Sequence, residues 1–364
     1  MEFYKQELLA LKKTNRLRER KIYDNTIIDM ASNDYLGLSS KKQLLKKAYK
    51  RVKKDRYNSS KASPLVNGYT PIHQKFEQLL CKINQFEDAI TLGNGFLANI
   101  SLIEALVRKK DILLIDQEYH ASGILATSLA QGQVVTFRHN DYNDLENKII
   151  QYKQKNQRII IAIEGVYSMS GDIAPLEFNT ISKKYNAILI VDEAHSSGVI
   201  GDNLLGWYDY YNITIEPYHI KMGTLGKAYG SYGAYILASK HIISYLENRA
   251  KQFIYSTAIS TFDISLAYEN LKYIQKNKRK LQNKITKFQS LVETILSIKI
   301  PSLILPIVIN DNKKVLQIQQ KLLIKGYLIG AIRQPTVEKA ILRIILKLDV
   351  DQKELKKLLL LLKT

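Results

Sequence analysis

Short apolar runs alternate with helical patterns through the middle of the chain. The runs lie at 88–92, 111–116, 134–137, 158–164, 187–192, 219–222 and 233–238. Most are continuous and β-branched, and the stretches between them, such as PLEFNTISKKY, have helical spacing. Strands that are buried on both faces have continuous apolar runs, so the pattern predicts an α/β fold with a mostly parallel sheet between helices.

The pattern changes near residue 240, where long Lys- and Leu-rich helices begin. A later apolar run, SLILPIVI, and a final helix, DQKELKKLLLLLKT, predict a smaller α+β lobe. At 364 residues the chain is long enough for more than one lobe. We therefore predict an N-terminal segment (1–40), a large α/β domain (41–265) and a small C-terminal α+β domain (266–364).

Polar residues with possible chemistry follow several predicted strands. His120, Ser168, Asp192 and Lys227 all lie at or soon after a strand's carboxyl end, where open sheets of this kind bind ligands. Asp192 could cap the following helix or could pair with a buried cationic nitrogen, since a buried carboxylate is costly without a partner. His195, three residues later, could equally be a structural histidine.

Lys227 lies among small residues in GTLGKAYG, and Gly226 and Ala228 leave room for a planar ligand beside it. A desolvated lysine has a lowered pKa, which makes its amine nucleophilic toward carbonyls. Upstream, GNGFLANI places Gly95 at the start of a helix, where free N–H groups favour phosphate, although a plain turn also fits these residues. Thr224 adds a hydroxyl. Together these groups predict a pyridoxal phosphate site.

Four segments resemble the hallmarks of the α-oxoamine synthases in order and spacing. They are SNDYLGLSS (32–40), EGVYSMSGDIAPL (164–176), VDEAHSSGVIG (191–201) and GTLGKAYG (223–230), and the similarity runs from about residue 30 to 346. Members of this family are fold-type-I pyridoxal phosphate enzymes that condense an amino acid with an acyl thioester. The resemblance implies the same fold, cofactor and reaction class here.

The resemblance also implies roles for the catalytic residues. Lys227 would form the Schiff base with the cofactor and later act as the base, and Asp192 would pair with the pyridine nitrogen. His195 and Ser168 would hold the phenolic oxygen of the ring. His120 would stack on the ring face.

Other matching positions would bind the phosphate and the amino acid. The phosphate would contact Gly95, Phe96 and Thr224. Thr257 resembles the position that reaches the phosphate of the neighbouring subunit, which implies a homodimer with the active site at its interface. Asn33 would border the amino-acid site, and Arg343 would bind the substrate carboxylate with its planar fork.

The segment GAIRQPTVEKAILRI (330–344) is similar to the branch of the family that joins L-alanine to a pimeloyl thioester in biotin biosynthesis. Arg333 is its distinguishing residue and a predicted substrate contact, although it could be an ordinary surface arginine. The alternatives are glycine with acetyl-CoA, or serine with a long acyl thioester. Whether the thioester is carried by coenzyme A or by an acyl carrier protein stays open.

Two segments and one single residue depart from the family pattern. SSKASPLVNGY (59–69) replaces a glycine-rich stretch and has Pro64 where arginine is common, which leaves the acyl chain open because this loop borders the acyl channel in the family. Ser170 replaces an aspartate, with little effect expected. STAISTFDI (256–264) lacks the usual prolines, which weakens the expected contact with a second subunit. For His73, helix capping is at least as good an explanation as catalysis.

The net charge, the single cysteine and the lengths of the apolar runs indicate which classes of function are less suitable. The net charge of +20 comes from dispersed basic residues, which indicates coding bias rather than nucleic-acid binding, although a basic surface would also attract an acidic carrier protein. Cys81 is the single cysteine, so no internal disulfide is expected, and it is predicted to be buried filler rather than a nucleophile. The apolar runs are too short for a membrane span, and the N-terminus lacks a signal-peptide core. We predict a cytoplasmic enzyme.

Other classes of protein fit less well. GNGFLA lacks the GxGxxG spacing of a dinucleotide-binding dehydrogenase, and no metal-ligand spacing is present. A basic binding protein that kept the fold would not need Lys227, Asp192, His195 and His120 together.

Overall fold

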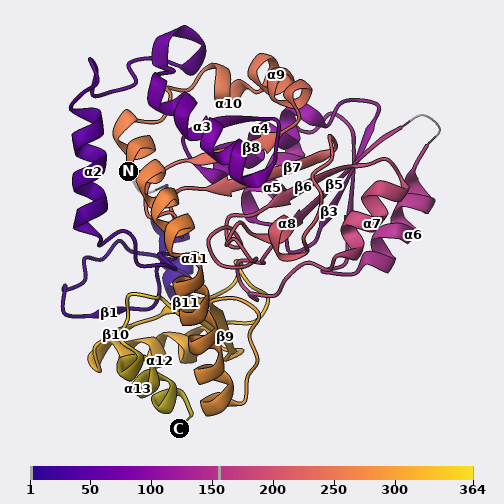
Figure 1. The fold of residues 1–364 in the computed structure, drawn as a ribbon. Helices are drawn as coiled ribbons and strands as arrows, with labels where there is room; N and C mark the ends of the chain where they lie inside the picture. Colours follow the sequence, from indigo (N-terminus) through magenta and orange to yellow (C-terminus); the bar gives the residue numbers. More distant parts are fainter. Residues whose placement is uncertain (1–2, 155–156, 364) are drawn as a thin grey trace.

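The computed structural model describes residues 3–154 and 157–363 (Figure 1). Its centre is a seven-stranded sheet in the order β2-β8-β7-β6-β5-β3-β4, in which only β8 pairs antiparallel with its neighbours. The strands are β2 (Asp88–Leu92), β3 (Asp111–Asp116), β4 (Gln133–Phe137), β5 (Arg158–Glu164), β6 (Ile188–Asp192), β7 (His219–Thr224) and β8 (Ala234–Ala238). Each predicted apolar run is one of these strands, so the predicted fold class is confirmed.

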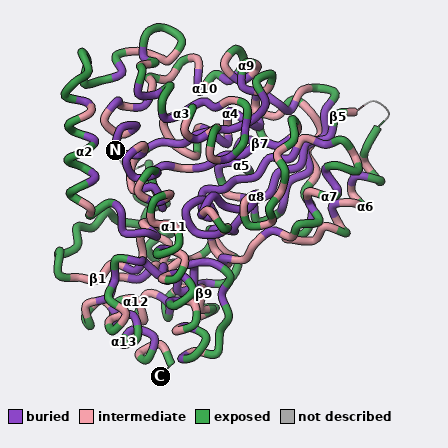
Figure 2. Tube along the Cα trace, viewed as in Figure 1, coloured by how far each residue is buried: buried purple, intermediate pink, exposed green. Residues whose placement is uncertain are grey.

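Helices cover both faces of this sheet. Figure 2 shows that the strands form the buried centre of the large lobe. The helices of the large lobe are α2 (Lys42–Val52), α3 (Pro71–Asn84), α4 (Gly95–Leu106), α5 (Ala121–Ala126), α6 (Tyr142–Tyr152), α7 (Glu177–Lys184), α8 (Trp207–Tyr210), α9 (Lys240–Arg249) and α10 (Lys251–Ile254). Successive residues of a strand enter different cores: Ile161 packs in one hydrophobic cluster and Ile160 in the other. This two-sided burial explains why the apolar runs are continuous.

The C-terminal lobe contains a three-stranded antiparallel sheet of β11 (Gly330–Ile332), β12 (Ile341–Ile345) and β9 (Ile304–Val308). Its helices are α12 (Asn312–Ile324) and α13 (Gln352–Lys363). The N-terminal segment joins this lobe, because β1 (Ile28–Asp29) pairs in parallel with β10 (Tyr327–Leu328). A 36-residue helix, α11 (Thr261–Leu296), packs against α2 and α3 above and α13 below. The predicted boundary at residue 265 falls inside this helix.

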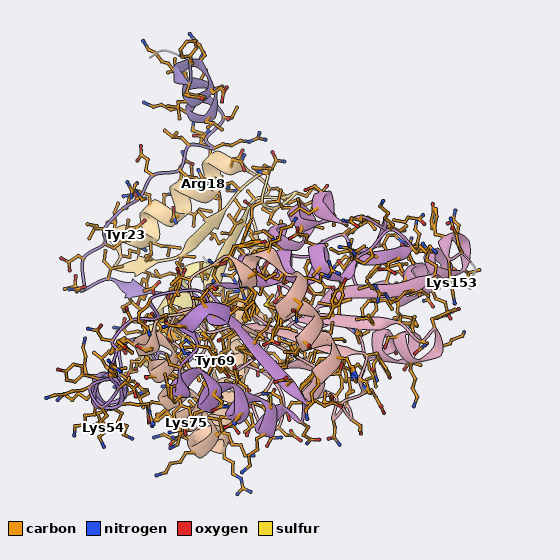
Figure 3. All side chains as sticks on the ribbon, turned by 90° about the horizontal axis from the view of Figure 1, so that it is seen from above. Arg18, Tyr23, Lys54, Tyr69, Lys75 and Lys153 are labelled. Atoms are coloured by element: carbon orange, nitrogen blue, oxygen red, sulfur yellow. The ribbon has the colours of Figure 1, made fainter. Side chains whose placement is uncertain are left out.

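The first helix, α1 (Lys5–Lys13), has no buried residue. Figure 3 shows it standing clear of the body beyond Arg18. In the described part of the chain, no helix is both long and apolar enough to cross a membrane.

Helix α3 contains two residues whose roles the sequence left between structure and chemistry. His73 forms a capping box with Thr70, and its Nε2 lies 2.9 Å from the carbonyl oxygen of Ile259. Cys81 is half-buried against the core, and burial raises the pKa of its thiol to about 12. The contacts of His73 are those of a helix cap. A thiol with so high a pKa is a poor nucleophile at neutral pH, so Cys81 is a structural residue as well.

Candidate active site

The carboxyl ends of β3, β5, β6 and β7 meet around one cavity of about 180 Å³. Its walls are formed by Gly95, Phe96, Asn99, His120, Glu164, Asp192, Ala194, His195, Met222, Thr224 and Lys227. Seven predicted site residues are therefore brought together from segments far apart in the sequence. Strand-end convergence produces the site, as the sheet topology requires.

Lys227 lies in the turn after β7, and its Nζ is 2.7 Å from Nε2 of His195. Burial lowers the pKa of Lys227 to about 8, and the nearby carboxyls of Asp192 and Glu164 oppose this change. The turn is tight because Gly230 has a φ of +53° and a side chain there would collide with Leu38. The amine is thus fixed in the cavity and partly deprotonated near neutral pH, as a nucleophilic lysine must be.

His195 is held by a tyrosine that the sequence did not single out. The Tyr35 hydroxyl lies 2.6 Å from Nδ1 of His195, and both side chains are buried. Burial lowers the pKa of His195 well below its usual value, and the charges of Lys227 and Arg343 lower it further. His195 is therefore neutral and links Tyr35 to the reactive lysine.

Asp192 belongs to a network centred on Asn99 of α4. The Asn99 amide nitrogen donates to Asp192 Oδ2 and to Ser122 Oγ, at 2.9 Å each, and its oxygen accepts from the Tyr119 hydroxyl at 2.8 Å. Ser122 Oγ lies 2.7 Å from Nδ1 of His120. Asn99 thus fixes both the carboxylate below the cavity and the imidazole beside it. Its one sequence signal is an amide within an apolar helix.

The N-terminus of α4 also lines the cavity, since the helix begins at Gly95 with Asn94 as its side-chain cap. The first N–H groups of a helix have no intrahelical acceptor, so those of Gly95 and Phe96 are free to bind an anion, which the helix dipole also favours. Thr224 lies beside Gly95, with its Oγ1 accepting from the N–H of Gly226. This end is suited to a phosphate.

Arg343 extends from β12 of the small lobe toward the same site. Its Nε donates to the carbonyl of Ser168 at 2.7 Å, and its Nη1 donates to Asn33 Oδ1 at 2.9 Å. Its Nη2 is buried and has no hydrogen-bond partner within the described part of the chain. Two contacts therefore aim the guanidinium while one nitrogen stays available. The observed contacts of Ser168 are made by its peptide group, and a role for its hydroxyl stays a prediction.

Besides Asn33, Ser168 and Arg343, two further predicted site residues, Arg333 and Thr257, are not among the residues that line the cavity. Arg333 Nη1 donates to the backbone oxygen of Asn15 at 2.6 Å, in a loop that contacts the N-terminal segment. Thr257 is exposed, and the neighbouring Ala258 bonds to Ala62 in the altered 59–69 loop. Their proposed roles depend on a longer acyl chain and on a second subunit, respectively.

The residues around the cavity meet the requirements of pyridoxal phosphate. A nucleophilic amine, a buried carboxyl, a neutral imidazole and a helix N-terminus surround one space. Arg343, whose Nη2 has no hydrogen-bond partner in the described residues, is near enough for its charge to lower the pKa of Lys227. Burial lowers the pKa of His120, so it presents an uncharged ring to a bound aromatic group. The cavity therefore has the kinds of groups that bind this cofactor.

Comparison with known proteins agrees with this geometry. The sequence matches the family model of aminotransferase class I and II over residues 25–360. The chain belongs to this family. An 8-amino-7-oxononanoate synthase of Helicobacter pylori (strain J99) is 44% identical over 356 residues, covering 98% of this chain and 95% of the relative. Membership and these relatives assign a pyridoxal-phosphate-dependent acyltransferase of the α-oxoamine synthase type.

Solved structures of the aminotransferase class I and II fold superpose well. An 8-amino-7-oxononanoate synthase from Francisella tularensis has a TM-score of 0.74 at 29% identity, covering 92% of this chain and 96% of its own. A serine palmitoyltransferase from S. paucimobilis, solved with a bound PLP–myriocin aldimine, has a TM-score of 0.89 at 21% identity, with coverages of 98% and 95%. At that identity the second likeness establishes the fold alone.

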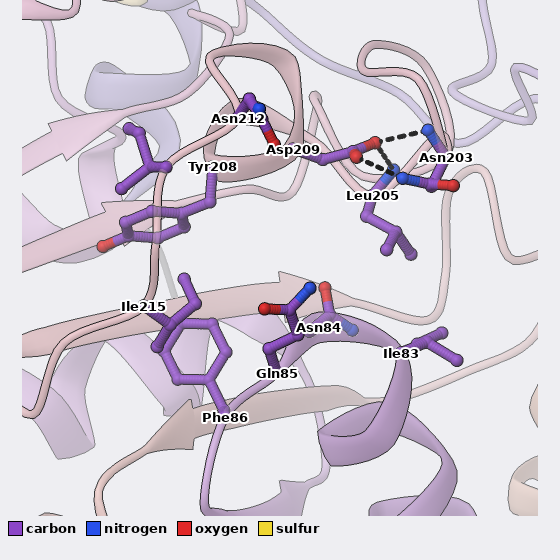
Figure 4. Close-up of a pocket in the computed structure, with 11 residues that line it drawn as sticks. Ile83, Asn84, Gln85, Phe86, Asn203, Leu205, Tyr208, Asp209, Asn212 and Ile215 are labelled. Atoms are coloured by element: carbon purple, nitrogen blue, oxygen red, sulfur yellow. Dashed lines mark hydrogen bonds between the residues drawn. The ribbon is translucent and has the colours of Figure 1, made fainter.

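A second cavity, of about 80 Å³, lies between the end of α3 and the loop around α8 (Figure 4). Its most polar group, Asp209, already accepts hydrogen bonds from Asn203 and from the N–H of Leu205. It shares no lining residue with the cofactor cavity. Its one acidic side chain is thus committed to the loop.

His139 and His219, which do not line the cavity, have structural contacts. His139 Nδ1 lies 3.1 Å from Asp116 and its Nε2 2.9 Å from Asp172. His219 accepts the N–H of Glu216 and lies 2.8 Å from the Asn179 side chain.

Proposed function

We propose that this chain condenses L-alanine with a pimeloyl thioester, with loss of carbon dioxide, to give 8-amino-7-oxononanoate for biotin biosynthesis. The substrate assignment is supported above all by 44% identity to an 8-amino-7-oxononanoate synthase over nearly the whole chain. The reaction class is supported by Lys227 and His195, which are in contact, and by Asp192, which lines the same cavity.

The amino-acid end of the site would be formed by Arg343. Its free Nη2 is placed to bind the carboxylate of alanine, and Asn33 and the carbonyl of Ser168 hold the guanidinium in position. Arginine suits this task because its planar fork matches a carboxylate. Its positive charge also lowers the pKa of Lys227, which keeps the amine available as a base.

The proton transfers would be carried out by Lys227. Bound pyridoxal phosphate supplies the electron sink that stabilises negative charge at the Cα carbon. Lys227 removes the Cα proton, the Cα carbon attacks the thioester carbonyl, and the thiol carrier leaves. The resulting β-keto acid then loses its carboxylate as carbon dioxide, and a proton returns to Cα.

The acyl end would involve Arg333 and the N-terminal segment. β11 pairs Gly330 with Arg343, and Arg333 lies three residues further along, which is about 10 Å at the rise of an extended strand. Arg16 and Arg18 donate to Gln334 and Thr336 in the same loop. This group of arginines favours an acyl chain that ends in a carboxylate, as a pimeloyl chain does, over an acetyl or palmitoyl chain.

A homodimer would complete the cofactor site. Large apolar side chains are exposed beside the cavity and in the segments that contain the altered loop and Thr257, namely Leu65, Phe96, Tyr232 and Tyr255. Such a surface is typical of an interface between copies of the chain. In the dimer, Thr257 would contact the phosphate bound by the partner.

The test is product formation by purified protein with added pyridoxal phosphate, followed by mass spectrometry. L-Alanine would be supplied with pimeloyl-acyl carrier protein or pimeloyl-CoA, glycine with acetyl-CoA, and L-serine with palmitoyl-CoA. We expect 8-amino-7-oxononanoate from the alanine reactions and no product from Lys227→Ala. Product from the glycine or serine pair alone would overturn the substrate assignment, and a visible cofactor band that persists in Lys227→Ala would overturn the role of the lysine.

A further inference from the structure

Glu164 is a second carboxyl at the floor of the cofactor cavity. β5 ends at Glu164 and β6 ends at Asp192, and the two residues are register partners in parallel strands. Paired residues of neighbouring strands point to the same face of a sheet, so both carboxyls meet at one edge, and both line the cavity.

One oxygen of the Glu164 carboxyl has a hydrogen bond of good geometry, and the other lies near the backbone N–H of His120 without one in the described residues. The side chain is 1% exposed. Oε2 accepts the N–H of Ser168 at 3.1 Å, whereas Oε1 is buried without a hydrogen-bond partner in the described residues. A buried polar atom without a partner is costly, so one that faces a ligand cavity indicates a contact that the ligand completes. Asp192, by comparison, accepts a hydrogen bond on each oxygen, from Asn99 and from the N–H of Ala194.

The electrostatic setting decides which proton state Glu164 has. Burial raises the pKa of Glu164 well above its usual value, and the neighbouring Asp192 raises it further, while Lys227 and the backbone N–H groups of Ser168 and His120 oppose the change. The charged and titratable groups around it are Asp192, His195, Lys227, His120, Arg343, Tyr35, Tyr119 and Tyr167. Two like carboxylates in one cavity cannot both ionise easily, so their environments separate their proton states.

We infer that Glu164 is a further cofactor-contacting residue, a neutral carboxylic acid whose Oε1 donates a hydrogen bond to an acceptor oxygen of the bound cofactor or of the amino acid joined to it. Asp192 is then the carboxyl that would pair with the pyridine nitrogen of the cofactor. Glu164 also supports Arg343 indirectly. The N–H of Ser168 donates to Glu164, and the carbonyl oxygen of Ser168 accepts a hydrogen bond from Arg343. This inference rests on the cofactor part of the proposed function and not on the acyl substrate.

The test uses two substitutions in the full-length protein. Glu164→Gln keeps the shape, an acceptor for Ser168 and a donor toward the cavity, but it cannot ionise. Glu164→Leu keeps the bulk and removes both hydrogen bonds. The measurements are the dissociation constant of pyridoxal phosphate, by titration of the apo protein, and the pH midpoint at which the bound cofactor's visible absorption changes.

If Glu164 is a neutral donor, Glu164→Gln binds the cofactor about as tightly as the natural protein, and the midpoint stays where it was. Glu164→Leu binds it about 5- to 100-fold more weakly, the range for one lost hydrogen bond to a ligand. If Glu164 were ionised, Glu164→Gln would remove a negative charge beside the Schiff base and lower the midpoint by roughly 1–3 pH units. That shift, or full cofactor affinity in Glu164→Leu, would overturn the inference.

Glu77→Gln is the matched control. Glu77 is also a buried glutamate with a raised pKa, about 8, but its partners are Tyr69 and Thr91 away from the cavity. It should leave both cofactor measurements unchanged. Glu164→Gln alone keeps the test valid if Glu164→Leu does not fold. Because neither measurement uses the acyl donor, failure of the condensation assay would leave this test intact.

Discussion

Replacing Arg343 by glutamine tests the proposed amino-acid site most directly. The substitution removes the free Nη2 and the positive charge that would bind the substrate carboxylate. It also removes the donors to Ser168 and Asn33, although the shorter amide can retain one of these hydrogen bonds. The cavity residues that would hold the cofactor itself are untouched.

The expected magnitude follows from the hydrogen bonds to the substrate that the substitution removes. One hydrogen bond to a charged group contributes about 1.5–3 kcal/mol, and each 1.4 kcal/mol is about tenfold in affinity. Nη2 is the guanidinium nitrogen without a hydrogen-bond partner in the described residues, so we expect L-alanine to bind roughly 10- to 150-fold more weakly. If a second nitrogen of the guanidinium also binds the carboxylate, the value should lie at the upper end.

The assay is the change in visible absorption of the bound cofactor on titration with L-alanine or with L-alaninamide, which lacks the carboxylate. The natural protein should bind L-alanine more tightly than the amide. In Arg343→Gln this preference should disappear because only the binding of L-alanine is weakened. Arg333→Gln is the matched control, since it removes an arginine from the proposed acyl end and should leave L-alanine binding unchanged.

Two results would refute the reasoning. Equal weakening of L-alanine and L-alaninamide would mean that Arg343 shapes the site without binding the carboxylate. Unchanged L-alanine affinity would place the carboxylate elsewhere. A thermal unfolding curve of the apo variant separates both from a general loss of structure.

Three further predictions concern the supporting residues. Because the pKa of Lys227 is about 8, its neutral fraction rises about fivefold from pH 7 to pH 8, and the rate at which apo protein captures pyridoxal phosphate should rise with it and level off above pH 9 in stopped-flow absorbance. Asn99→Leu should weaken cofactor binding, and lower the free energy of unfolding by about 1–3 kcal/mol, because it removes the donor to Asp192 Oδ2, although the N–H of Ala194 still donates to Oδ1; an unchanged cofactor dissociation constant would contradict its role. Burial disfavours the charged form of His139, but paired carboxylates, Asp172 among them, outweigh this effect and raise its pKa to about 10, above its unfolded value. The stability that His139 contributes should therefore be full below about pH 6.5 and be lost as the pH rises toward 10, as judged by urea unfolding of His139→Gln; a loss on acidification would contradict this sign.

The sequence contained most of the sheet because its strands are buried on both faces. Continuous β-branched runs such as RIIIAIE have few alternatives when helical patterns separate them, and β5 begins and ends where that run does. The limits of the lobes were harder to infer. α11 crosses the predicted boundary and β1 joins the C-terminal lobe, and both features depend on pairing between distant segments.

In the candidate site, too, local patterns could be found from the sequence and contacts between distant segments could not. Lys227, Asp192 and His120 follow strands and could be found from spacing, whereas Tyr35 and Asn99 act through partners 160 and 93 residues away. No local pattern indicates such contacts. Glu164 is different, since it closes a buried strand as Asp192 does, and the cost of burying an unpaired carboxylate applied to both.

The long helix that joins the lobes sets how the site can move. With 36 residues, α11 is about 54 Å long, and it packs against helices of both lobes. Lys227 comes from one lobe and Arg343 from the other, so the helix works as a strut that fixes the span between amine and guanidinium. The distance between the Lys227 amine and the Arg343 guanidinium therefore limits the size of the amino acid that can bind. A larger amino acid would have to be accommodated by different side chains between these two groups rather than by movement of the lobes.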